Sequence, residues 1–277
     1  MSAETWFSES LHPYYRKSLR IEEVLFEGRS DFQQIQVFRT AFFGNTLVLD
    51  GIIQLTEKDN MGYHEMITHV PMLAVENPEN VLIVGGGDGG SLRQVLRYSS
   101  VKHAVLCELD QMVVDVSRKY FPAFGDPLSD PRAELVIRDA FDYLAENVSK
   151  FDVIISDTTD PIGMAERLFS DEFYRLMAAA LKPGGAMATQ CEQPYFDDDL
   201  ILKIYQSAQE VFKNPAYYYA QVPTYPGGGI GFMYGSDVPW TNGLSKPTPP
   251  GVYEYLNPEI HQAAFALPEF FRCRLYK

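Results

Sequence analysis

Residues 80–91 read Asn-Val-Leu-Ile-Val-Gly-Gly-Gly-Asp-Gly-Gly-Ser, and the interpretation of the whole chain starts from them. The four consecutive apolar residues 81–84 are typical of a short strand that is buried on both faces of a parallel sheet. The glycines that follow permit a tight turn and a close approach of the backbone to a ligand. Residues 91–98 favour a helix. Strand, glycine-rich turn and helix in this order predict the first unit of a nucleotide-binding α/β fold.

The chain beyond this unit alternates between strand-like and helix-like segments. Short apolar runs predict further strands at residues 104–107, 134–137, 151–156 and 185–190. Helical spacing predicts helices at residues 112–120, 141–147 and 173–181. Residues 217–234 favour two late strands. This alternation predicts a doubly wound, mostly parallel, Rossmann-like (methyltransferase-like) sheet with its ligand at the carboxyl ends of the strands.

The segment before the glycine-rich unit has a different pattern. Residues 18–27 and 32–38 partly alternate between apolar and polar side chains, as half-buried strands do. Asp50-Gly51 separates two apolar runs and predicts a tight hairpin turn. Helical spacing begins near residue 63 and continues to residue 75. We therefore predict a small N-terminal antiparallel β domain over residues 1–62 and a Rossmann-like catalytic domain over residues 63–277.

The composition excludes several classes of partner. The formal net charge is −14, so nucleic acid and anionic membranes are not expected partners. No apolar run approaches the roughly 20 residues of a membrane-spanning helix. Three widely spaced cysteines favour a reducing cytoplasm and argue against a zinc site. The acidic balance suits a cationic substrate, although an acidic surface that only keeps a protein soluble would give the same charge.

Polar residues in and after the glycine loop indicate a nucleoside site. Glu108 ends the next predicted strand, roughly 20 residues after Gly85, where a carboxylate suits hydrogen bonding to ribose hydroxyls. A structural turn followed by a solvated glutamate is the alternative. Asp88 stands where a pyrophosphate would otherwise contact backbone N–H groups, and its carboxylate repels phosphate. The loop therefore favours a nucleoside that carries a cationic tail.

Further carboxylates follow the next two strands of the predicted sheet. Asp139-Ala140 follows the third strand, and Asp157 ends the fourth, with Asp160 three residues later. A single aspartate at such a point is usually a helix cap. Carboxylates after four consecutive strands would instead converge on one cleft, which predicts a site for polycations where one acid can deprotonate an amine.

Several motifs together resemble one known family. These are Tyr63-His-Glu-Met, Gly85-Gly-Gly-Asp-Gly-Gly, Cys107-Glu-Leu-Asp, Ile155-Ser-Asp-Thr-Thr-Asp-Pro-Ile-Gly, Pro223-Thr-Tyr-Pro and Ala263-Ala-Phe-Ala-Leu-Pro. In this order they resemble the spermidine synthases, the polyamine aminopropyltransferase family, over nearly the whole chain. The resemblance implies that Asp157 is the catalytic proton acceptor. It implies that the polyamine is bound by Tyr63, His64, Asp88, Asp160 and Tyr225, and the donor by Gln33, Gly85, Asp88, Glu108, Asp139, Ala140 and Met164. At Met164 the family usually has proline.

The resemblance also implies a reaction. An aminopropyl group would pass from decarboxylated S-adenosylmethionine, a co-substrate, to putrescine, giving spermidine and methylthioadenosine without a metal or cofactor. A homodimer or homotetramer is expected. Cadaverine, agmatine or spermidine as acceptor stays open. A methyltransferase on the same fold and a non-catalytic polyamine-binding protein are the rival interpretations.

Overall fold

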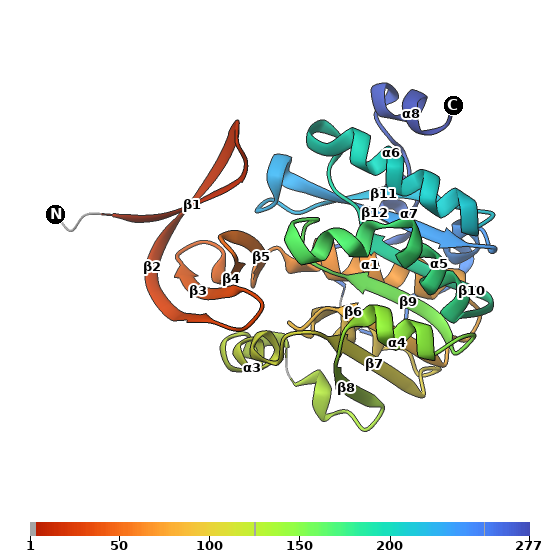
Figure 1. Ribbon diagram of the computed structural model, residues 1–277, viewed down its shortest axis with the longest axis horizontal. Coiled ribbons are helices and arrows are strands. Elements are labelled where there is room, and N and C mark those ends of the chain that lie inside the picture. The colour runs from red at the N-terminus through yellow and green to blue at the C-terminus, as the bar shows by residue number, and fades with distance from the viewer. Residues whose placement is uncertain (1–3, 125, 252) are drawn as a thin grey trace.

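The N-terminal part of the chain forms an antiparallel sheet. The computed structural model describes residues 4–124, 126–251 and 253–277. Five strands pair in sequence order, and Figure 1 shows them as a curved unit beside the larger part of the molecule. Their bounds are β1 (Thr5–His12), β2 (Tyr15–Arg29), β3 (Gln34–Thr40), β4 (Gly44–Leu49) and β5 (Ile52–Thr56).

The turn between β4 and β5 has the predicted form. Leu49 pairs with Ile52, so only Asp50 and Gly51 connect the strands. Both residues have positive φ angles, 47° and 80° respectively. This is the backbone that a two-residue hairpin requires, and aspartate followed by glycine adopts it readily. The hairpin prediction is confirmed.

The larger sheet has seven strands in the order β11-β12-β10-β9-β6-β7-β8. The five strands from β10 to β8 in this order are parallel, and β12 and β11 add an antiparallel edge. The predicted doubly wound, mostly parallel sheet with a small N-terminal β unit is confirmed. The strands are β6 (Asn80–Gly85), β7 (His103–Glu108), β8 (Ala133–Ile137), β9 (Phe151–Asp157), β10 (Leu181–Gln190), β11 (Ala216–Gln221) and β12 (Gly229–Ser236).

Helices cover both faces of this sheet (Figure 1). Along β6, Val81 and Ile83 belong to the core under α1 and α2, whereas Leu82 and Val84 belong to the core under α4, α5, α6 and α8. Burial on both faces is the reason why β6 is continuously apolar. The helices are α1 (Asn60–Ala74), α2 (Gly90–Val95), α3 (Gln111–Tyr120), α4 (Ala140–Glu146), α5 (Asp171–Ala180), α6 (Pro194–Val211), α7 (Pro258–Ala263) and α8 (Glu269–Leu275).

The structure contains elements that the sequence analysis did not predict. They are β1, the 18-residue α6, and the short α7 and α8. Helical spacing was present in α6, where Ile201, Ile204 and Ala208 are buried on one face. The predicted helix at residues 91–98 is too long, since α2 ends at Val95 and a turn follows.

The two sheets are joined through α3. One face of the N-terminal sheet packs on this helix and on the turn after it, with Ile35, Val37 and Leu47 against Val113 and Phe121. The sheet ends at Thr56 and α1 begins at Asn60. The division at residue 62 stays a prediction.

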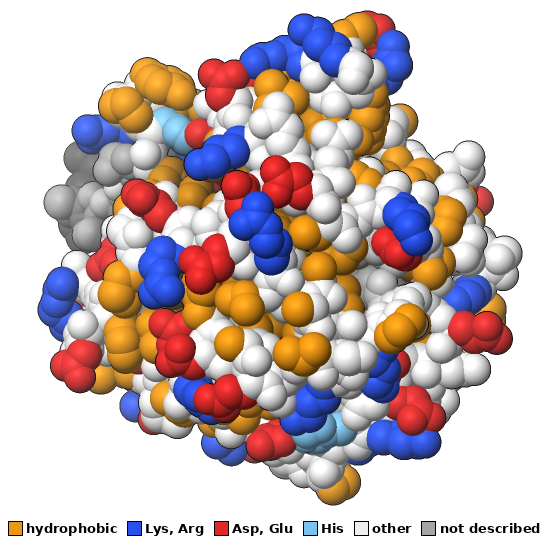
Figure 2. All heavy atoms as spheres, turned by 45° about the vertical axis from the view of Figure 1, so that its right-hand side comes forward, with side chains coloured by type: hydrophobic (Ala, Val, Ile, Leu, Met, Phe, Trp, Pro, Cys, Tyr) orange, Lys and Arg blue, Asp and Glu red, His pale blue; other side chains and the backbone are white. Residues whose placement is uncertain are grey.

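The outer surface mixes side chains of different types. On the face in Figure 2, acidic, basic and apolar side chains are interspersed. Within the residues that the structure describes, no helix combines the length and the apolar character that crossing a bilayer requires.

Glu65 in α1 holds the segment before α7. Its side chain is buried and accepts three backbone hydrogen bonds, from the N–H groups of residues 254, 255 and 256, at 3.0, 3.1 and 2.7 Å. One carboxylate therefore binds three consecutive amides far away in the sequence. The same helix carries Tyr63 and His64.

We predict that Glu65→Ala lowers the free energy of unfolding by about 3 kcal/mol or more, because hydrogen bonds to a charged group are lost and buried amides stay unpaired. Urea denaturation measures this change. Glu22→Ala, at an exposed position of β2, is the matched control and should have little effect. Equal stability of the Glu65 variant and the control would contradict the stabilising role of the three Glu65 hydrogen bonds.

Candidate active site

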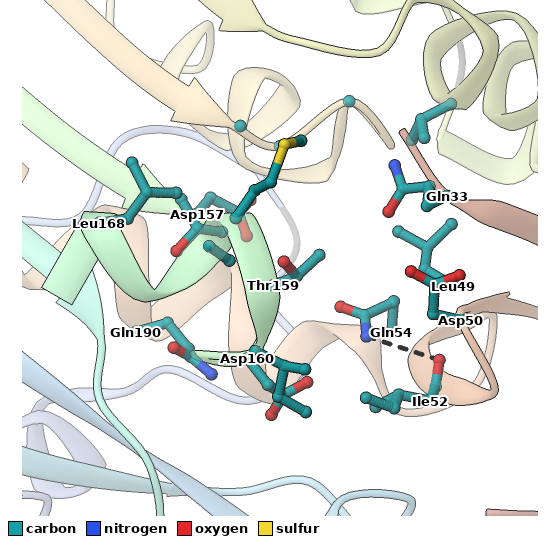
Figure 3. A pocket seen from close by; sticks show the side chains of 18 of the residues that line it. Gln33, Leu49, Asp50, Ile52, Gln54, Asp157, Thr159, Asp160, Leu168 and Gln190 are labelled. Carbon is teal, nitrogen blue, oxygen red and sulfur yellow. Dashed lines mark hydrogen bonds between the residues drawn. The ribbon is translucent and has the colours of Figure 1, made fainter. Parts of the chain in front are cut away.

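A cavity of about 630 Å³ lies at the carboxyl ends of β6, β7, β8 and β9. The strand order reverses between β6 and β9, because β7 and β8 lie on one side of β6 and β9 and β10 on the other. Ligands of such sheets bind at this point. Figure 3 shows Asp157, Thr159 and Asp160 on one side and Gln33 and Gln54 of the N-terminal sheet on the other. Eleven of the predicted residues line the cavity: Gln33, Tyr63, Gly85, Asp88, Glu108, Asp139, Ala140, Asp157, Asp160, Met164 and Tyr225.

The glycine loop packs tightly against the end of β9. The N–H of Gly86 donates to the carbonyl oxygen of Asp157 at 2.7 Å. Gly85 and Gly86 have φ angles of 73° and 63°. A Cβ atom on Gly85 would lie 2.2 Å from the same carbonyl oxygen, so only glycine fits there. This contact sets the position of the Asp157 side chain relative to Asp88 in the loop.

Asp88 already has two partners in the structure. Its Oδ1 accepts a hydrogen bond from the N–H of Gly90 at 2.6 Å and lies 3.3 Å from His64 Nε2. Burial raises the pKa of Asp88, but the neighbouring His64 and the Gly90 hydrogen bond outweigh it, and the pKa is lowered. Burial in turn lowers the pKa of His64, and Asp88 reverses this to a net increase. His64 is therefore buried behind Asp88 and does not line the cavity itself. It influences the cavity through the charge and position of the Asp88 carboxylate.

Asp157 lies in the same group of charges. Its Oδ2 accepts a hydrogen bond from the Ser91 hydroxyl at 2.6 Å. Burial and the nearby Asp88 raise the pKa of Asp157 to about 6, although His64 and hydrogen bonds from Ser91 and Tyr63 act against the shift. One ligand atom from each of His64, Asp88 and Asp157 lies within 4.8 Å of the others, so this group can surround a cation. A carboxylate with this pKa can accept a proton near neutral pH.

Two tyrosines form the wall beside Asp157. The rings of Tyr63 and Tyr225 lie 5.9 Å apart at 70°. The hydroxyl of Tyr225 donates to the backbone oxygen of Gln54 at 2.5 Å, which fixes this ring against the N-terminal sheet. Burial raises the pKa of both tyrosines well above the usual value. Both rings therefore stay neutral, and neutral aromatic faces attract cations.

The predicted ribose-binding Glu108 is held by backbone groups. The N–H groups of Gly87, Leu109 and Asp110 donate to its carboxylate at 3.1, 2.7 and 2.9 Å. Burial nevertheless raises its pKa to about 7. Next to it, Gln33, just before β3, donates to Asp110 Oδ2 at 3.0 Å, which connects the N-terminal sheet to this side of the cavity.

The remaining predicted donor residues lie along the same wall. Asp139 caps α4 by accepting from the N–H of Phe141 at 2.7 Å, and Ala140 begins that helix. Met164 lies in the 3-10 segment η3 (Gly163–Phe169), with its side chain 62% exposed. The binding roles of these residues stay predictions.

Sequence reasoning missed several residues of the cavity. Glu192, two residues after β10, lines it and is buried. The rule that found acids after four strands would have found this one after the fifth. Gln54, His12 and Asp197 also line the cavity, but they come from a hairpin strand, from the end of β1 and from α6. The pattern of acids after parallel strands does not indicate them, because Gln54 and His12 are not acids and Asp197 lies in a helix.

Comparison with known proteins gives concordant results. Residues 60–243 match the family model of the spermine/spermidine synthase domain, and residues 5–57 match that of the spermidine synthase tetramerisation domain. A polyamine aminopropyltransferase of Leptospira biflexa is 43% identical over 96% of each chain. Spermidine synthase 2 of Arabidopsis thaliana is 43% identical over 96% of this chain and 82% of its own.

Solved structures agree with this relationship. A spermidine synthase in complex with the transition-state analogue AdoDATO superimposes with a TM-score of 0.94 at 37% identity, over 98% of this chain and 95% of the other. The family matches cover most of the chain, including the glycine loop, Asp157 and the five-stranded sheet. The chain belongs to the spermine/spermidine synthase family of enzymes.

Proposed function

We propose that this enzyme transfers the aminopropyl group of decarboxylated S-adenosylmethionine to putrescine, giving spermidine and methylthioadenosine. The observation that carries the proposal is the group formed by the buried Asp157, Tyr63 and His64 and the half-buried Asp88, at the point where the strand order of the sheet reverses. The group combines a base of suitable pKa with carboxylates and aromatic rings that suit cationic amines.

The chemistry follows from the charges of the substrates. Aliphatic amines titrate near 10.4, as lysine does, so the attacking nitrogen arrives protonated and has no free electron pair. Asp157 accepts this proton. The nitrogen then forms a bond to the methylene carbon beside the sulfonium, and the carbon–sulfur electron pair passes to sulfur. Methylthioadenosine departs as a neutral thioether, so the step balances without a metal or a redox cofactor.

The other groups align the reactants. Asp88 would hold the ammonium of the donor tail, and His64 fixes the Asp88 carboxylate from the side. Glu108 would bind the ribose of the donor, and Gln33, Asp139, Ala140 and Met164 would also contact the donor. Tyr63, Tyr225 and Asp160 would hold the acceptor. Alignment of nitrogen, carbon and sulfur supplies much of the acceleration in this type of reaction.

The choice of acceptor is a separate part of the proposal. The spermine synthase of Arabidopsis thaliana is 42% identical, nearly as similar as the spermidine synthases, so overall identity does not select an acceptor. We favour putrescine, because Asp157 and Asp160, which line the cavity together with Tyr63 and Tyr225, suit a short diamine with one nitrogen at each carboxylate.

Assembly and location complete the proposal. The match of residues 5–57 to a tetramerisation domain supports a homo-oligomer, and we propose a homodimer or homotetramer. The edge of β1 is available for such contacts, because it lies at the end of the five-stranded order. We also propose a cytoplasmic location, in line with the free thiols of Cys107, Cys191 and Cys273.

Asp157→Asn should lower kcat by at least ~10², the lower range for the loss of a general base. In the unchanged enzyme, kcat/KM for putrescine should fall as the pH decreases through about 6, because the raised pKa makes protonated Asp157 prevail below that value. Release of methylthioadenosine measures both effects, and circular dichroism checks the fold. Near-normal turnover in a folded variant would refute the role of Asp157 as base.

Asp88→Asn should change the preference between two donor forms. Binding of decarboxylated S-adenosylmethionine should weaken, while binding of intact S-adenosylmethionine should hold or improve, because Asp88 attracts the ammonium of the first and repels the carboxylate of the second. Calorimetric titration with both compounds measures the ratio. An equal loss for both forms would mean that Asp88 serves only the structure, and preferred binding of the intact form by the unchanged enzyme would favour a methyltransferase.

A further inference from the structure

The β1–β2 hairpin closes one end of the cavity. His12 is the last residue of β1 and lines the cavity. Its ring stacks on Phe196 of α6, with centroids 4.7 Å apart and planes at 21°, and on Tyr14 at 5.8 Å and 22°. The His12 side chain is only 10% exposed. Two stacking partners hold the imidazole in one place at this end of the cavity.

The group opposite the imidazole is Asp197, near the start of α6. The backbone of Asp197 departs from the helix, with φ −136° and ψ 36°, and its side chain lines the cavity. Its Oδ2 atom is buried without a hydrogen-bond partner in the described part of the chain, and lies 3.8 Å from His12 Nε2. The next two residues, Asp198 and Asp199, pair with Arg274 instead. A buried carboxylate oxygen without a hydrogen bond is costly, and a cationic ligand would satisfy it.

Asp197 belongs to a group of three acids. Burial raises the pKa of Asp160, Glu192 and Asp197, and the charge of Asp197 raises the pKa of the other two further. His12 acts in the opposite direction on both Asp160 and Asp197. This end of the cavity therefore holds three carboxyl groups and one imidazole. These are more acidic groups than the second ammonium of a diamine alone can pair with.

We propose that His12 limits the length of the amine acceptor by occupying an additional ammonium site whose carboxylate is Asp197. The inference rests on the proposed aminopropyl transfer and names a residue that determines its specificity. A diamine needs Asp157 for the attacking nitrogen and Asp160 with Glu192 for the other. A triamine brings a third ammonium, which must displace the imidazole from Asp197 or remain unpaired, and both are costly.

The test compares two acceptors in several variants. Methylthioadenosine release is measured with putrescine and with spermidine, and the ratio of kcat/KM for spermidine to that for putrescine is the readout. His12→Ala should raise this ratio at least ~10-fold, because it opens the end of the cavity and frees Asp197. In the His12→Ala background, Asp197→Asn should cancel the gain, because the freed site then lacks its charge.

Two control variants separate this effect from a loosened hairpin. Tyr14→Ala removes the 73% exposed ring that stacks on His12, and it should raise the ratio much less than His12→Ala, because Phe196 still holds the imidazole beside Asp197. Asp199→Asn removes a charge from the same helix at a site 90% exposed and should leave the ratio unchanged. Thermal unfolding checks each variant. If His12→Ala does not fold, His12→Asn replaces it, with a rise in the ratio expected there too.

The outcomes distinguish the two proposals. If the unchanged enzyme releases no methylthioadenosine with any amine, the proposed function fails. If it uses putrescine and the ratio does not rise in the His12 variants, only the length limit is refuted. The same holds if Tyr14→Ala gives an equal rise, or if the gain survives Asp197→Asn.

Discussion

The hydrogen bond from the Gly86 N–H to the Asp157 carbonyl oxygen, 2.7 Å long, connects the loop after β6 to the end of β9. It forms only because Gly85 has no side chain, since a Cβ atom there would overlap that oxygen. The close approach brings Asp88 and Asp157 to the same part of the cavity, where the charge of Asp88 raises the pKa of Asp157. This part of the cavity therefore depends on the absence of a side chain at Gly85 as much as on the carboxylates themselves.

This arrangement concentrates negative charge in a buried place. Burial raises the pKa of Asp157 to about 6 and that of Glu108 to about 7, and it also raises those of Asp160, Glu192 and Asp197. Each raised pKa means that the folded protein holds the ionised acid at a cost in free energy. Cationic substrates would relieve that cost on binding. The free energy that burial costs these carboxylates is recovered when cations pair with them, which favours binding of polyamines.

The N-terminal sheet contributes directly to the cavity. It packs on α3 through an apolar core, and from that position it supplies Gln33, Gln54 and His12 to the wall. The backbone oxygen of Gln54 also holds the Tyr225 hydroxyl. The sheet is therefore part of the cavity wall, and its attachment to the larger sheet determines the dimensions of the cavity on that side.

Local sequence determined the parts of this protein that depend on neighbours along the chain. The apolar strand at residues 81–84, the Asp50-Gly51 turn and the acids after successive strands follow from side-chain pattern and backbone preference. They were sufficient to predict the parallel sheet and the acids at its carboxyl ends that line the cavity. Only the tertiary structure decided that His64 pairs with Asp88 and that His12 faces Asp197. Those partners lie on elements separated by long stretches of chain. Their contact arises from the packing of α1, α6 and the hairpin around the cavity, which no local pattern contains.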